Sequence, residues 1–176
     1  MLRTLIRCSH AEVMLQPVIR KATDDDVPDL ARLWFDGWQD AHAAILPAQL
    51  RRLRTLKSFT ERLAERLADV WLAEHSGRVA GFAMLKGDEL YQFYVSAEAR
   101  GTNVAPNLMA DALERLQATG AAVAWLACAI GNNRAARFYE KLGWHRAGVM
   151  TSRLPTPEGV FELDVWRYEI SLASST

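Results

Sequence analysis

The first clear signal in the chain is a series of short apolar runs separated by turn residues. Such runs occur at residues 70–74, 79–85 and 90–95. The breaks between them are Ser76-Gly77 and Lys86-Gly87-Asp88, which contain the residue types that form tight turns. The pattern therefore predicts three consecutive strands that pair as an antiparallel meander.

Four other segments repeat apolar residues at helical spacing. The first follows the capping carboxylates Asp24-Asp25-Asp26 and carries Leu30 and Leu33 on its apolar face. Ser58 and Glu61 predict a capping box for a second helix that ends near Asp69. The third and strongest helix spans 104–119 and stops at Gly120, and the fourth spans 133–142 and stops at Gly143.

Further strands are predicted at 18–20, at 122–129, where small and β-branched residues suit a buried strand, and at 160–170, where polar and apolar residues alternate. The order β-α-α-β-β-β-α-β-α-β-β, in which two strands follow the last helix and residues 160–170 form one of them, predicts one mixed α/β domain. We assign residues 17–172 to it. Residues 1–16 are treated as an unassigned N-terminal extension and 173–176 as a C-terminal tail.

Composition narrows the possible functions. The 176 residues include 21 basic and 21 acidic side chains, so no cationic excess favours nucleic acid or an anionic membrane surface. Cys8 and Cys128 lack metal-ligand spacing, so neither a metal site nor a disulfide framework is expected. The longest apolar stretch, residues 121–130, is about half the length of a membrane-spanning helix. We therefore expect a cytoplasmic protein.

A candidate phosphate-binding loop lies between the third meander strand and the strongest helix. It reads Arg100-Gly101-Thr102-Asn103-Val104-Ala105. Unpaired N–H groups at a helix start attract anions, and Arg100 can add a charged contact. The alternative is a tight turn at Gly101 with a solvated arginine, and the hexapeptide alone does not decide between the two.

A second segment is more specific. It reads Asn132-Asn133-Arg134-Ala135-Ala136-Arg137-Phe138-Tyr139-Glu140-Lys141-Leu142-Gly143-Trp144. Together with the loop, this segment resembles the GCN5-related N-acetyltransferase (GNAT) family, whose motifs are Arg/Gln-x-x-Gly-x-Gly/Ala and Asn-x-x-Ala-x-x-Phe-Tyr-Glu-Lys-Leu-Gly-Phe. Through the order of elements, the resemblance covers about residues 17–170. It departs at Asn103, where the family usually has glycine, and at Trp144, which replaces phenylalanine.

The resemblance implies a GNAT-like fold: a central, mostly antiparallel sheet flanked by helices, in which parallel strands 4 and 5 splay apart to hold acetyl-CoA. It also implies that backbone groups near Tyr94 and Val95 pair with the pantetheine arm and that the 100–105 loop holds the pyrophosphate. Asn132 and Phe138 would line the other side of the cofactor, although packing in the core is an equal alternative for Phe138.

For catalysis, the resemblance gives Tyr139 the role of general acid and Glu89 that of base. Glu89 can equally be an exposed carboxylate at a strand end, with Tyr91 and Gln92 holding a water instead. Cys128 has no sequence cue for an activating partner and is interpreted as a buried structural residue, which favours direct transfer in a ternary complex. His42 and His145 are interpreted as ordinary surface or satisfied histidines.

The implied acceptor is a small-molecule or peptide amine. Trp34, Trp38 and Tyr91 are candidate acceptor-binding residues, although the helical spacing of the two tryptophans favours core packing. The sequence is also compatible with a homodimer. The alternative function is an acetyl-CoA-binding or sensing domain with weak or no catalysis.

Overall fold

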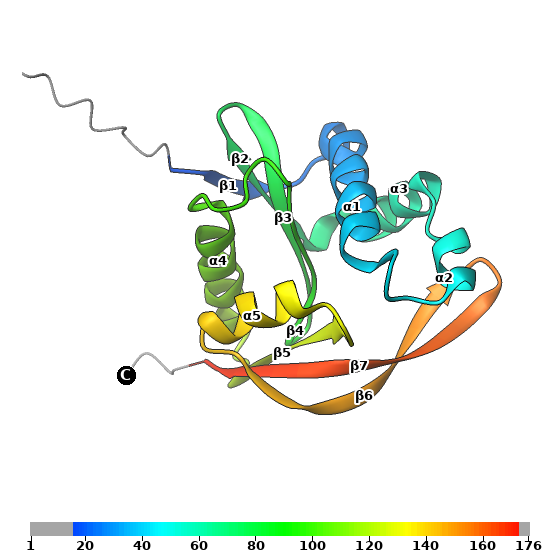
Figure 1. Cartoon of the computed structure of the whole chain (residues 1–176). Coiled ribbons are helices and arrows are strands. Elements are labelled where there is room, and N and C mark those ends of the chain that lie inside the picture. Colours follow the sequence, from blue (N-terminus) through cyan, green and yellow to red (C-terminus); the bar gives the residue numbers. More distant parts are fainter. Residues whose placement is uncertain (1–15, 173–176) are drawn as a thin grey trace, which may run out of the picture.

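The computed structural model describes residues 16–172; the predicted N-terminal extension lies almost wholly, and the C-terminal tail entirely, outside this range. Figure 1 shows a central sheet flanked by helices. The strands are β1 (Val18–Lys21), β2 (Val70–His75), β3 (Arg78–Lys86), β4 (Glu89–Val95), β5 (Val123–Ala129), β6 (His145–Thr156) and β7 (Gly159–Ser171). The helices are α1 (Val27–His42), α2 (Ala48–Leu53), α3 (Leu56–Glu65), α4 (Val104–Ala118) and α5 (Asn133–Lys141), with short 3-10 turns at Asp24–Asp26 and Leu67–Asp69.

The strands form one sheet in the order β1-β2-β3-β4-β5-β7-β6. All neighbours are antiparallel except β4 and β5, which run parallel. The β2–β3 turn has positive φ at both Ser76 (53°) and Gly77 (72°), as a tight hairpin requires. The mixed sheet and the predicted meander are thus confirmed.

The β4–β5 pair is unusually short. Glu89 and Trp125 are the one pair of partners between the two strands, and the Trp125 N–H donates to the Asp88 carbonyl at 3.1 Å. Beyond this point the strands diverge, and the edges of β4 and β5 that face each other lose their ladder. The sheet therefore contains the splayed parallel pair that the resemblance implies.

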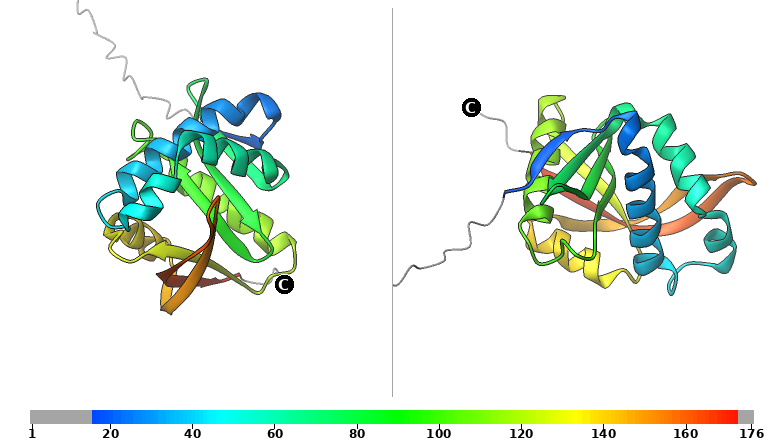
Figure 2. Two further views of the ribbon diagram at one scale, coloured as in Figure 1. Left: turned by 90° about the vertical axis from the view of Figure 1, so that its right-hand side faces the viewer. Right: turned by 90° about the horizontal axis from the view of Figure 1, so that it is seen from above.

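Helices cover both faces of the sheet (Figure 2). On one face, α4 and α5 pack over a core cluster that includes Leu108, Leu116 and Leu126. On the other face, α1 and α3 pack over a second cluster around Trp34 and Phe59. The Trp34 ring centroid lies 4.8 Å from that of Phe59, and burying an aromatic ring of this kind contributes about 1.5–3 kcal/mol. Each face thus anchors a separate group of helices.

The second helical region differs from the prediction. The proposed capping box of Ser58 and Glu61 is wrong: α3 begins three residues earlier, and the Thr55 hydroxyl caps it by accepting from the Ser58 N–H at 3.2 Å. Glu61 instead pairs with Lys57 on the helix surface. The short helix α2 was not predicted, because six residues show too little periodicity to be recognised.

The last two strands form a long hairpin that extends past the sheet. Its distal part reaches α2 and α3, as Figure 1 shows, and Leu154, Phe161 and Leu163 pack against the α1–α3 core cluster. The Pro155 carbonyl accepts a hydrogen bond from Arg54 Nη1 at 3.2 Å. The hairpin therefore covers the side of β4 that faces α3.

Candidate active site

The loop between β4 and α4 presents free backbone donors. Gly101 has a φ of +76°, a conformation that suits glycine, and the Thr102 hydroxyl accepts from the Val104 N–H at 3.3 Å. Within residues 16–172, the N–H groups of Gly101, Asn103 and Ala105 have no protein acceptor. Three free donors at the start of a 15-residue helix form a site suited to an anion.

The departure at Asn103 leaves the backbone of this loop unstrained. Asn103 has φ −80° and ψ 0°, which most residues can adopt, so this position does not need glycine for its conformation. Its side-chain amide donates to Gln16 Oε1 at 3.1 Å. Asparagine in place of glycine therefore adds a side chain to the loop but does not change the backbone conformation that the loop can adopt.

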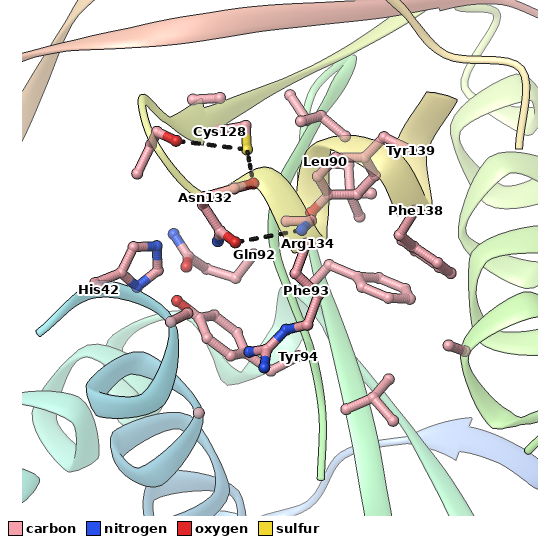
Figure 3. A pocket seen from close by; sticks show the side chains of 18 of the residues that line it. His42, Leu90, Gln92, Phe93, Tyr94, Cys128, Asn132, Arg134, Phe138 and Tyr139 are labelled. Atoms are coloured by element: carbon pink, nitrogen blue, oxygen red, sulfur yellow. Dashed lines mark hydrogen bonds between the residues drawn. The ribbon is translucent and has the colours of Figure 1, made fainter. Parts of the chain in front are cut away.

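A cavity of about 340 Å³ opens where β4 and β5 diverge. Figure 3 shows its walls, formed by β4, the end of β5, α5 and the end of α1. The predicted site residues that line it are Tyr91, Tyr94, Val95, Arg100, Gly101, Ala105, Asn132, Phe138 and Tyr139. The structure thus brings the loop motif and the α5 motif to a single cavity.

The α5 residues reach the cavity because Asn132 caps the helix. Its side chain accepts from the Ala135 N–H at 3.2 Å, which fixes the first turn of α5. One turn later Phe138 stacks on Phe93 of β4, with ring centroids 5.7 Å apart. Phe138 therefore both packs in the core and lines the cavity.

Tyr139 is a largely buried residue that lines the cavity. Its ring is 9% exposed and packs edge-on against Trp144, with ring centroids 6.1 Å apart. The hydroxyl makes no hydrogen bond to any other residue in the described part of the chain. Burial raises the pKa of Tyr139 well above its usual range, so the phenol keeps its proton at neutral pH.

Cys128 also lines the cavity but is not an activated nucleophile. The residue is buried, and its sulfur lies 3.8 Å from the Ala129 carbonyl and 3.9 Å from that of Asn132. Burial raises the pKa of this thiol to about 11. Cys128 is therefore a neutral thiol, in agreement with its interpretation as a structural residue.

The role of Gly37 in the α1 wall of the cavity was not predicted from the sequence. A Cβ at Gly37 would lie 2.8 Å from Tyr94 Cδ1, so glycine lets the helix approach β4 closely. The signal was present as an isolated glycine inside a helical pattern, which often has a packing reason. Gly37, Ala41 and His42 complete this side of the cavity.

The interpretation of His42 as an ordinary surface or satisfied histidine was wrong, because its Nδ1 is buried and has no hydrogen-bond partner among the described residues. The side chain lines the cavity beside Tyr94 and Gln92 in Figure 3. Burial lowers its pKa to about 4, a contact with the Trp38 backbone partly opposes this shift, and the charge of Arg134 adds to it. His42 is thus neutral at physiological pH. His145 is exposed, as expected.

An ion-pair bridge joins the two motifs at the rim of the cavity. One carboxylate oxygen of Asp40 accepts from Arg100 at 2.7 Å and from Arg134 at 2.6 Å. The guanidinium of Arg134, with that of Arg100, holds the pKa of Asp40 below its usual range against the effect of burial. Two cations are therefore held close to the 100–105 loop. Sequence reasoning missed the role of Arg134 because its partner lies 94 residues away.

Several predicted site residues lie outside the cavity wall. Trp34 and Trp38 are buried in the core cluster, as their helical spacing favoured. Thr102, Asn103 and Val104 belong to the loop but do not line the cavity. Glu89 lies where β4 and β5 still pair, and burial raises its pKa to about 7. The structure does not bring Glu89 to the cavity surface.

Two further properties of the described residues bear on other functions. No helix between residues 16 and 172 is long and apolar enough to cross a membrane. In the same range, no group of three or more His, Cys, Asp or Glu side chains is arranged to hold a metal ion.

The fold, with its mixed sheet and splayed parallel strands, is of the GNAT type. The model of the acetyltransferase (GNAT) family matches residues 28–144, and the chain belongs to this family.

Among individual proteins, an uncharacterised N-acetyltransferase of Mycobacterium bovis is 35% identical over 120 residues, 63% of this chain and 77% of that protein. A GCN5-related N-acetyltransferase from Rhodopseudomonas palustris has a similar structure, with a TM-score of 0.72 at 22% identity over 91% of this chain and 98% of its own. YncA from Salmonella typhimurium, solved with its cofactor acetyl-CoA, has a TM-score of 0.65 at 17% identity over 92% and 96% of the two chains.

Proposed function

We propose that this protein is an N-acetyltransferase that moves the acetyl group of acetyl-CoA to a primary amine by direct attack in a ternary complex. The observation that carries the proposal is the 340 Å³ cavity between the splayed strands. The loop with the free N–H donors adjoins this cavity, and the protonated Tyr139 lines it. Acetyl-CoA in the structure of YncA supports the choice of cosubstrate.

Each part of the cosubstrate has a matching feature of the protein. The N–H groups of Gly101, Asn103 and Ala105 suit the pyrophosphate, with Arg100 and Arg134 at the rim. The unpaired backbone of β4 near Tyr94 and Val95 suits the pantetheine amides, which can pair like an added strand. Asn132 and Phe138 line the opposite wall.

The chemical step needs a neutral amine, a positioned thioester and a proton donor. The amine nitrogen attacks the thioester carbonyl, a C–N bond forms, and the C–S bond breaks. Tyr139 donates its phenolic proton to the departing thiolate, a role supported by its raised pKa and by a hydroxyl that has no hydrogen-bond partner among the described residues. The neutral thiol of Cys128 argues against an acyl-enzyme route.

The proton leaving the amine goes either to Glu89 or to a water chain held by Tyr91 and Gln92. Glu89 is suited in acidity, since its pKa of about 7 makes it a base near neutral pH. It lies outside the cavity wall, so its action would need intervening water. Glu89→Gln separates the two routes: loss of the acidic limb in the pH–rate profile supports Glu89, and an unchanged profile supports the water chain.

The first test is binding. Millimolar acetyl-CoA should raise the melting temperature while NAD should not, because the loop does not open a dinucleotide-binding βαβ unit. A melting curve that acetyl-CoA leaves unmoved would refute the cosubstrate. Release of free thiol with an amine panel then tests catalysis. Tight binding without thiol release from any amine would favour the alternative, a domain that binds acetyl-CoA without turnover.

A further inference from the structure

Two arginines without acidic partners lie on the α3 side of β4. Arg54 ends helix α2 and is only 3% exposed. Its hydrogen bond is to the Pro155 carbonyl of the β6–β7 hairpin, and within residues 16–172 no carboxylate forms an ion pair with it. Burying a charged guanidinium that has a single neutral hydrogen-bond acceptor costs folding free energy. The burial of Arg54 without an anionic partner therefore needs an explanation.

Arg62 of α3 is the second cation of this pair. Its guanidinium lies over the Trp34 ring, 4.4 Å from the centroid, and its Nη2 donates to the Tyr91 hydroxyl at 3.3 Å. No carboxylate in the described chain pairs with Arg62 either. Burial first, and then the charge of Arg62, lowers the pKa of Arg54 to about 10. Arg54 therefore remains charged at neutral pH.

Two tyrosines connect this arginine pair to the cavity. Tyr91 and Tyr94 both line the cavity wall. Tyr91 also receives the Arg62 hydrogen bond. Both tyrosines pack with the α1–α3 core cluster, whereas Phe93 packs with the opposite one. The arginine pair thus lies behind the tyrosine side of the cavity, under the distal part of the β6–β7 hairpin.

We propose that the amine acceptor also carries an anionic group, a carboxylate or a phosphate, that Arg62 binds this group, and that the buried Arg54 adds its charge to the attraction. The proposal rests on the proposed acetyltransferase function and specifies its substrate class. A planar guanidinium group binds carboxylate and phosphate oxygens with paired hydrogen bonds. A ligand with a carboxylate or phosphate group would supply the anionic partner that neither arginine has within the described chain. Polycationic amines are disfavoured by the same two charges.

The test compares amines that differ in one anionic group. Pairs of L-amino acids and their amides, and of phosphoethanolamine and ethanolamine, are assayed by thiol release at saturating acetyl-CoA. The anionic member of at least one type of pair should have a kcat/KM higher by about 10–100-fold, the usual worth of a charged hydrogen bond. The amino-acid pairs and the phosphate pair distinguish the two anions. Equal or better turnover of the uncharged members overturns the proposal.

A variant then assigns the preference to the arginines. Arg62→Gln should lower kcat/KM for the anionic member by about 10–100-fold and leave that for its uncharged partner within about threefold. Arg52→Gln, which removes an exposed arginine from α2, is the matched control and should preserve the preference. An equal loss for both members in Arg62→Gln indicates a structural role and overturns the proposal.

Thermal stabilisation by acetyl-CoA tests the proposed cosubstrate separately from the anionic acceptor. Arg62→Gln should retain the thermal stabilisation by acetyl-CoA, because Arg62 does not line the cavity. If acetyl-CoA stabilises the wild-type protein but neither member of any pair is acetylated, the anionic acceptor is refuted and the cosubstrate assignment stands. If acetyl-CoA itself fails to bind, the proposed function is refuted.

Discussion

Replacing Tyr139 by phenylalanine removes one oxygen from the cavity and leaves the ring. The ring contacts with Phe138, Trp144 and Tyr168, at centroid distances of 5.6, 6.1 and 6.0 Å, should persist. Because the hydroxyl has no hydrogen-bond partner among the described residues, the free energy of unfolding should change by less than about 1 kcal/mol. If the hydroxyl protonates the thiolate, turnover should fall by about 10²–10⁴-fold, which corresponds to about 3–5 kcal/mol of activation free energy.

The assay measures turnover, acetyl-CoA affinity and thermal stability of both proteins with one acceptor. Tyr168→Phe is the matched control, since its hydroxyl bonds to Arg146 and Glu140 and lies outside the cavity wall. This control should lose about 1–3 kcal/mol of stability and keep its turnover within a few-fold. Unchanged turnover in Tyr139→Phe, with chemistry shown to limit the rate, would refute the acid role.

Three further changes test the surroundings of the site. Gly37→Ala should lower the free energy of unfolding by about 1–3 kcal/mol although alanine is the better helix former, because the new Cβ would lie 2.8 Å from the Tyr94 ring. If chemical denaturation shows that the variant is as stable as the wild-type protein or more stable, the close approach is contradicted. Asn103→Gly should preserve or tighten acetyl-CoA binding in titration calorimetry, and a large loss would give the asparagine side chain a specific role. The hydrogen bond from Arg20 is the main reason why the pKa of Asp26 lies well below its usual range. The stability that this carboxylate contributes is therefore present above about pH 4 and is lost as the pH falls below that value. In Asp26→Asn, the free energy of unfolding should depend less on pH in that window, and a pH dependence identical to that of the wild-type protein would count against the Arg20–Asp26 pair.

The sequence predicted well those parts that depend on local signals. The meander followed from apolar runs and from Ser76-Gly77, whose positive φ values the structure confirms. Helices α4 and α5 were found within one residue of their observed ends, because long periodicity and a following glycine mark both. The loop and α5 motifs lie at the same cavity, as the family resemblance implied.

The parts that sequence reasoning missed depend on contacts between distant segments. Asp40 joins Arg100 and Arg134 across 60 and 94 residues, and neither spacing has a local signature. His42 looked ordinary because its burial is produced by packing against the rest of the cavity. The start of α3 was misplaced for a different reason, since Thr55 and Ser58 are both good caps and the hydrophobic pattern does not choose between them.

The divergence of β4 and β5 divides the sheet mechanically. A single residue pair, Glu89 with Trp125, connects the four strands β1 to β4 with the three strands β5, β7 and β6. A molecule that pairs with both free edges would connect the two halves of the sheet and couple their motions. Without it, we expect amide protons near the gap to exchange at rates set by small opening motions of the two halves; with it, both edges should be protected together.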